Sequence, residues 1–221
     1  MNHNPIRFNL ERRLRRYSIS NLMQYIVIGQ GIVFALLWIW PSLGYRLYSL
    51  ITLTRTGLMH GQIWRLVTFV FVPPSSSPIF ILFALYFYYL IGMGLEHRWG
   101  KVKFNLYYLV GMVAAVISAL ITGYAGNSFL NLSLFFAYAA LYPDEEVLLF
   151  MILPIKMKYL AALDAALYLY QFIVGSASTR VTIVLCLLNV FLFLGGDIIS
   201  TLRRESTYWK TRRNFRNAMK K

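Results

Sequence analysis

Ser128 is the residue of this sequence that comes nearest to a catalytic group. It follows Gly126 and Asn127 at the start of an apolar run that ends at Tyr142. A serine hydroxyl is a poor nucleophile unless a neighbouring base takes its proton. Three histidines are present and all of them precede Ser128: His3, His60 and His97. The sequence therefore supplies a possible nucleophile and no base after it.

Several other polar residues stand inside apolar runs: Asn131, Ser133, Asp164, Asn189 and Asp197. In a membrane such groups mark either a functional site or hydrogen bonds between helices. For Ser128, Asn131 and Ser133 we favour packing and hydrogen bonding. Asp164 fits structural hydrogen bonding or ion transport. We expect Asp197, which precedes two arginines, to form an ion pair at the membrane surface.

The composition indicates a membrane protein. Of the 221 residues, 58% are hydrophobic and 17% are aromatic. A helix needs about 20 apolar residues to cross a bilayer, and the sequence contains several runs of that kind. The one cysteine, Cys186, excludes a disulfide within the chain. We find no metal-ligand cluster and no phosphate-binding glycine loop, and we expect no cofactor.

The apolar runs predict an all-α, polytopic membrane protein, a bundle of six transmembrane helices. The predicted spans are Leu22–Trp40, Pro78–Leu95, Phe104–Tyr124, Ser128–Tyr142, Tyr159–Val174 and Val181–Leu202. The fourth begins with small and amide side chains, which allow helices to pack closely. We therefore expect it in the middle of the bundle. The membrane domain covers residues 21–202, and residues 203–221 form a basic tail.

Three segments do not fit a simple span. Residues 1–20 are basic with apolar residues at helical spacing, which predicts an amphipathic segment on the membrane surface that is not removed. Residues 41–77 are too polar to cross and too apolar for a free loop, and we expect a loop half-buried in the outer leaflet. Val147–Leu153, which Pro154 ends, is too short to cross and is interpreted as an interfacial or re-entrant piece.

The net charge of +14 is concentrated beside the spans. Of the 22 basic residues, 18 lie in the two tails and after spans two and four, and 4 lie on the opposite side: Arg46, Arg55, Arg65 and Arg180. The positive-inside rule then predicts that both termini are cytoplasmic. We expect the tails to contact anionic lipid head groups rather than nucleic acid. The predicted location is the bacterial cytoplasmic membrane.

Three local patterns, taken in order, resemble the rhomboid-like superfamily. Residues 61–69 are similar to its Trp-Arg signature, here Trp64 and Arg65. Residues 94–100 resemble its segment after span two and include Glu96, Arg98 and Gly100. Residues 136–158, with Tyr142-Pro143 and Pro154-Ile155-Lys156, are similar to its entry to span five. The resemblance implies that Trp64 and Arg65 anchor the first loop, and that Glu96 and Arg98 order the turn.

Active rhomboids are intramembrane serine proteases. The resemblance implies a serine in a Gly-x-Ser-Gly turn before span four and a histidine base in span six. Here Phe129 replaces the second glycine, and span six offers Asn189, Gly195 and Gly196 with no histidine. Two parts of the catalytic machinery are therefore missing. The chain is interpreted as a pseudoprotease, similar to the derlin-like group in lacking the dyad.

We therefore predict a catalytically inactive, rhomboid-like membrane protein that binds transmembrane segments of client proteins and affects their stability or trafficking. A different class, a small permease or ion carrier that uses Asp164, predicts a polar path through the bundle. An active protease with an unusual base is the third reading. Solute or ion flux into liposomes that depends on Asp164 would distinguish the permease or ion carrier from the client-binding protein.

Overall fold

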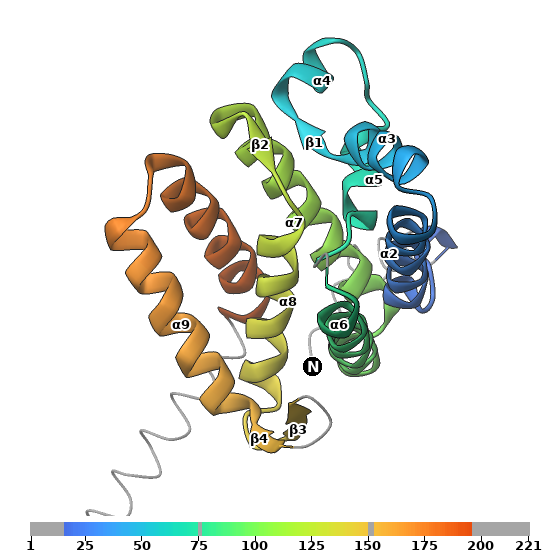
Figure 1. The fold of residues 1–221 in the computed structure, drawn as a ribbon. Coiled ribbons are helices and arrows are strands. Elements are labelled where there is room, and N and C mark those ends of the chain that lie inside the picture. The colour runs from blue at the N-terminus through green and yellow to red at the C-terminus, as the bar shows by residue number, and fades with distance from the viewer. Residues whose placement is uncertain (1–15, 75–76, 150–152, 196–221) are drawn as a thin grey trace, which may run out of the picture.

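The computed structural model of the chain describes residues 16–74, 77–149 and 153–195 (Figure 1). Most of the predicted amphipathic segment, the basic tail, Gly196 and Asp197 lie outside the described residues. Within them the architecture is helical, with two small two-stranded sheets. The predicted class, an all-α membrane protein, is confirmed.

In the described part of the chain, four helices are long and apolar enough to cross a membrane: α2 (Leu22–Ile39), α6 (Pro78–Trp99), α7 (Lys101–Thr122) and the helix Ala177–Gly195. Their positions agree with predicted spans one, two, three and six, apart from their ends. Two further helices, α8 (Ser128–Leu141) and α9 (Met157–Val174), agree with predicted spans four and five. The number of six spans stays a prediction.

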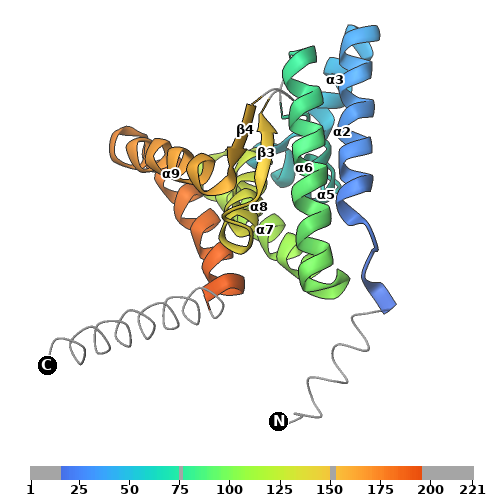
Figure 2. The ribbon, with the colours of Figure 1, turned by 90° about the horizontal axis from the view of Figure 1, so that it is seen from below.

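Helix α8 lies in the middle of the bundle, with α6, α7 and α9 packed around it (Figures 1 and 2). From Leu130 to Ala139 all its side chains are buried except that of Phe136, which is partly buried. Its 14 residues span only about 21 Å at 1.5 Å per residue, less than a bilayer core. The prediction that this segment lies inside the bundle is confirmed.

Helix α6 packs closely against two neighbours through glycines. A Cβ atom on Gly92 would lie 2.2 Å from Met23 of α2, and one on Gly94 would lie 2.4 Å from Tyr138 of α8. Small residues at such contacts let transmembrane helices approach closely. Gly100 follows α6 with a φ of 78°, which a glycine adopts easily, and turns the chain into α7.

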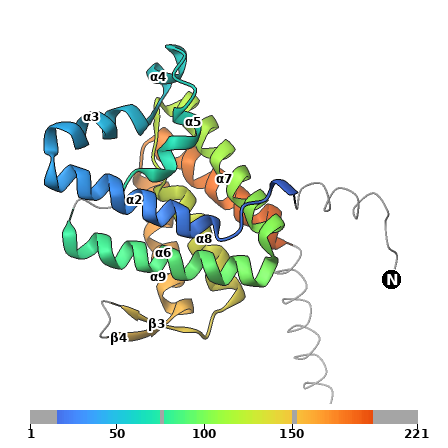
Figure 3. The same ribbon diagram turned by 90° about the vertical axis from the view of Figure 1, so that its right-hand side faces the viewer.

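The segment between α2 and α6 is structured. It contains α3 (Pro41–Ile51), β1 (Leu53–Thr54), α4 (Arg55–Met59), α5 (Arg65–Thr68) and the 3₁₀ turn η1 (Phe69–Phe71). Helix α3 folds back on α2 (Figure 3). Strand β1 pairs antiparallel with β2 (Tyr124–Ala125), which joins this segment to the chain just before α8.

The interpretation of residues 147–153 as an interfacial or re-entrant piece omitted strand structure. The segment contributes to a hairpin of β3 (Glu146–Leu149) and β4 (Leu153–Lys156), in which Val147 is opposite Ile155. A short apolar run does not distinguish a strand from a helix by periodicity alone. Pairing the two strands gives hydrogen-bond partners to backbone N–H and C=O groups that would be unsatisfied in a single apolar strand.

The packing of α3 on α2 gives a direct test. A Cβ atom on Gly44 would lie 2.5 Å from the Leu37 Cα atom, whereas one on Gly31 of α2 would meet its nearest neighbour, Leu85, at 3.7 Å. We expect Gly44→Ala to lower the free energy of unfolding by about 1–3 kcal/mol, because backbone cannot move aside as a side chain can. Gly31→Ala, the control, should be neutral or slightly stabilising.

The measurement is the apparent unfolding temperature of the detergent-solubilised protein. Equal unfolding temperatures for Gly44→Ala and Gly31→Ala would contradict the close backbone contact between α2 and α3.

Candidate functional site

Ser128 is exposed and is the first residue of α8. The preceding residue, Asn127, is buried, and its Nδ2 donates to the carbonyls of Val72 at 2.7 Å and Val70 at 3.3 Å. Gln30 of α2 donates to the same Val70 carbonyl at 2.7 Å. The residues around Ser128 thus fasten the start of α8 to η1 and α2.

The structure brings no histidine to Ser128 within the described residues. His97 lies at the end of α6 and Ser128 lies beyond the other end of α7, whose 22 residues extend about 33 Å at 1.5 Å per residue. His60 is exposed, and its Nδ1 bonds the Thr56 carbonyl at 2.7 Å within its own turn. His3 lies outside the described residues. Among the described residues, no histidine is hydrogen-bonded to Ser128 as activation of its hydroxyl would require.

Asn189 occupies the helix in which the resemblance implies a catalytic base. It is 2% exposed, and its Nδ2 donates to the Ser133 hydroxyl of α8 at 3.4 Å. Ser133 in turn donates to the Leu130 carbonyl at 2.8 Å. A cavity of about 20 Å³ beside this pair is lined by Gly111, among others. An amide does not take a proton as histidine does, so this pair joins the helices and does no acid–base chemistry.

Asn131 and Asp164 belong to a second group of polar side chains. Asn131 of α8 is 1% exposed, and the Tyr88 phenol of α6 is its polar neighbour. The same phenol lies near Asp164 and Tyr168 of α9. Three helices therefore bring these polar groups together, and Asp164 is partly buried among them.

Arg65 and Trp64 tie the first loop together. Arg65 is 7% exposed, its Nη1 donates to the carbonyls of Ser49, at 2.7 Å, and Thr52, and its Nε donates to Gln62 at 2.6 Å. The indole N–H of Trp64 donates to the Leu50 carbonyl at 3.2 Å. Both residues therefore close the end of α3 onto α5.

The residues after α6 have different roles from one another. Glu96 Oε1 accepts the backbone N–H of Asn21 at 2.8 Å, so Glu96 holds the start of α2. Arg98 is exposed. Near the end of the last described helix, a Cβ atom on Gly195 would meet nothing within 4 Å, so no close contact explains that glycine.

Sequence reasoning missed some of the polar contacts. Gln30 is fully buried and bonds η1, and Ser118 bonds Thr182 across two helices at 2.7 Å. Each is a single polar residue inside an apolar span, which was the available signal. Its partner is distant in sequence and was not predictable. In the ranges that the structure describes, no three His, Cys, Asp or Glu side chains gather as a metal site would require.

Comparison with family models identifies the class of protein. Residues 24–194, which cover the six helices discussed above except for the first two residues of α2 and the last residue of the final helix, match the model of a family described as eukaryotic integral membrane protein (DUF1751). The chain belongs to this family. Comparisons with curated proteins and with solved structures gave no match.

The family corrects the predicted location. The expectation of a bacterial cytoplasmic membrane was wrong, because the family is eukaryotic. An excess of basic residues beside apolar spans is found on the cytoplasmic side of membranes generally. The charge pattern therefore does not distinguish a bacterial membrane protein from a eukaryotic one.

The contacts of Arg65 predict a stability effect. We expect Arg65→Ala to lower the free energy of unfolding by about 2–3 kcal/mol, because buried carbonyls lose a charged donor. Arg65→Lys should recover only part of this loss, since one ammonium replaces a planar fork of donors. Thermal unfolding in detergent measures it, with Arg46→Ala, at an exposed arginine of α3, as the control. Equal effects at positions 65 and 46 would contradict the anchoring role.

Proposed function

We propose that this chain is a non-catalytic, rhomboid-like membrane protein that binds transmembrane segments of other proteins and affects their stability or trafficking. The observation that carries the proposal is the Ser133–Asn189 hydrogen bond between α8 and the helix Ala177–Gly195. In the rhomboids that the motifs resemble, the corresponding two helices carry the serine and its base. Here an amide–hydroxyl pair joins them.

The surroundings of Ser128 also support an inactive protein. Its hydroxyl is exposed at the end of α8, whereas Asn127, one residue earlier, is buried and engaged with two backbone carbonyls. A nucleophile needs a base within hydrogen-bond reach and the base needs an orienting partner. Neither His60 nor His97 is in that position.

Helix α9 supports binding of another transmembrane segment. Met157 is its one fully buried residue among those described, and α9 packs on α8 and β4. Its outer surface is apolar and exposed at Leu163, Leu167, Leu169, Tyr170, Ile173 and Val174. In a bilayer helices associate through packing and hydrogen bonds. Asp164 of α9, which is only partly buried, offers a hydrogen bond beside this surface.

The first experiment tests for client segments. A photo-crosslinking amino acid is placed at Leu167, one turn from Asp164, and at Leu120 of α7 as a matched control, because the two leucines are 49% and 45% exposed. In native membranes we expect position 167 to crosslink the transmembrane segments of a restricted set of proteins, and position 120 not to. Asp164→Asn should reduce those adducts severalfold.

The result that would overturn the proposal is the same crosslinking pattern at both positions, insensitive to Asp164→Asn. That pattern would mean that α9 meets neighbouring proteins only by random collision in the membrane.

Ser128 gives the second test. We expect a fluorophosphonate serine probe to label the wild-type protein no more than Ser128→Ala, because no base activates this hydroxyl. An active rhomboid protease, labelled in parallel, is the positive control. Labelling of the wild type that disappears in Ser128→Ala would show an activated nucleophile and would contradict the non-catalytic proposal.

A further inference from the structure

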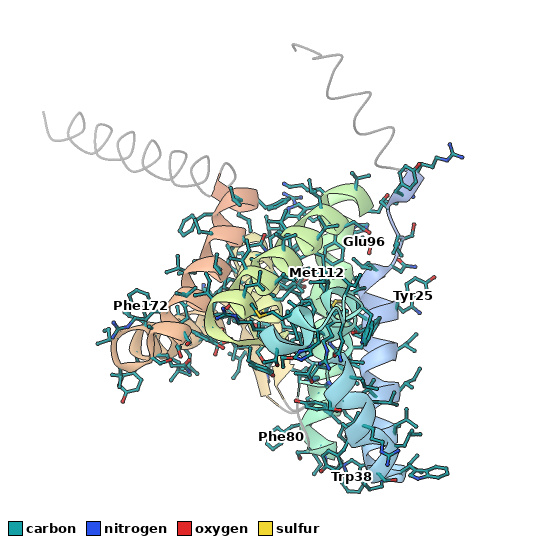
Figure 4. All side chains as sticks on the ribbon, turned by 90° about the horizontal axis from the view of Figure 1, so that it is seen from above. Tyr25, Trp38, Phe80, Glu96, Met112 and Phe172 are labelled. Atoms are coloured by element: carbon teal, nitrogen blue, oxygen red, sulfur yellow. The ribbon has the colours of Figure 1, made fainter. Side chains whose placement is uncertain are left out.

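A groove of about 510 Å³ lies between the first residues of α2, the turn η1 and helix α7. Its α7 wall includes Val102, Asn105, Leu106, Leu109 and Met112, which share one face of the helix, together with Tyr108. Figure 4 labels Tyr25 and Met112, which belong to its α2 and α7 walls. Nearly all of these walls are apolar.

The size of the groove decides what fits in it. A transmembrane helix about 10 Å wide and 30 Å long occupies more than about 2,000 Å³, even without its longer side chains. The groove has about 510 Å³, which is within the range of small-molecule sites. A single flexible acyl chain is therefore a better match than a helix. Its walls stay open toward the lipid, since Leu109 and Tyr25 are 58% and 62% exposed.

The mouth of the groove is held in place by Asn105. Its Oδ1 accepts the Ile19 backbone N–H at 3.0 Å, and its Nδ2 donates to the Ile19 carbonyl at 2.8 Å and the Lys101 carbonyl at 2.7 Å. These bonds fix residues 17–19, which line the groove, against the first turn of α7. The mouth is therefore a formed site and not a gap beside a loose segment.

Two basic residues adjoin in sequence the residues that line this mouth. Arg16 is exposed and precedes the groove residue Tyr17, and Lys101 precedes the groove residue Val102. The first turn of α7 adds backbone N–H groups that have no acceptor within the helix, which favours an anion. The carboxylate at this end, Glu96, accepts the Asn21 N–H at Oε1, and its Oε2 is buried without a hydrogen-bond partner among the described residues. Arg16 and Lys101 outnumber this one negative charge. The mouth therefore complements a negatively charged head group.

We propose that this groove binds an anionic phospholipid. One acyl chain lies between α2 and α7, and the phosphate-bearing head group is held by Arg16, Lys101 and the N–H groups of the first turn of α7. Basic pockets between transmembrane helices recognise anionic head groups in this way. The site is separate from the polar group beside α9, so it does not rest on the proposed client binding.

The test uses the full chain in nanodiscs of phosphatidylcholine with a tenth of phosphatidylserine. A photoreactive phosphatidylserine probe is compared with a phosphatidylcholine probe that has identical acyl chains, and the labelled residues are mapped by mass spectrometry. We expect the phosphatidylserine probe to label the groove residues of α2 and α7 at least threefold more than the phosphatidylcholine probe does.

Two variants separate the head group from the chain. The double variant Arg16→Gln/Lys101→Gln should bring the two probes to equal labelling, whereas Lys156→Gln, at a lysine outside the groove, should not. Leu109→Trp should fill the groove and reduce labelling by both probes, and Leu120→Trp on the same helix should not. The Gln variants change residues that are not buried, so the head-group test stands even where Leu109→Trp fails to fold.

Two results would overturn the proposal. One is equal labelling by the two probes in the wild type. The other is a preference for phosphatidylserine that survives the double variant, or that maps to helices other than α2 and α7. Either would mean that the groove holds ordinary boundary lipid.

Discussion

The backbone carbonyls of Val70 and Val72 set the main constraint on this structure. They belong to irregular chain around η1 that is buried in the bundle, where an unsatisfied carbonyl costs several kcal/mol. Two buried amides satisfy them, Gln30 from α2 and Asn127 from the start of α8. Helix α2, the segment between α2 and α6, and helix α8 are therefore joined at one place.

This junction explains how an irregular segment coexists with a membrane bundle. Residues 41–72 form short helices, which would leave many backbone N–H and C=O groups without hydrogen-bond partners in lipid. Arg65 satisfies the carbonyls at the end of α3, and β1 pairs with β2. Non-helical backbone at membrane depth is tolerated where protein covers it. Residues 41–72 are thus joined to the start of α8, where Asn127 is buried and Ser128 is exposed.

The two helices on which the resemblance implies a nucleophile and its base are joined here by a hydrogen bond between other residues. Asn189 and Ser133 come from the two helices that would hold base and nucleophile in an active rhomboid, and they form a hydrogen bond. An amide has both a donor and an acceptor but does not titrate near neutral pH, so it is a poor general base. This hydrogen bond therefore contributes to the packing of the two helices.

Much of the fold could be predicted from the sequence. Hydropathy and length placed six helices, because a helix in lipid needs about 20 apolar residues, and the small residues after Gly126 placed α8 inside the bundle. The β3–β4 hairpin was missed, since a seven-residue apolar run has no periodicity that distinguishes strand from helix. The helix ends also shifted by a few residues, as at Pro78–Trp99.

The sequence predicted which types of residue the candidate site contains, but not which of their side chains contact one another. The sequence by itself determined that no histidine follows His97 and that single polar residues interrupt the spans at Gln30, Asn131 and Asn189. Only the tertiary structure decided that Asn189 meets Ser133, that Gln30 meets Val70, and that Asn105 closes a groove against Ile19. Composition and spacing fix which side chains lie in the membrane, but the pairing of distant helices fixes which of those side chains satisfy one another.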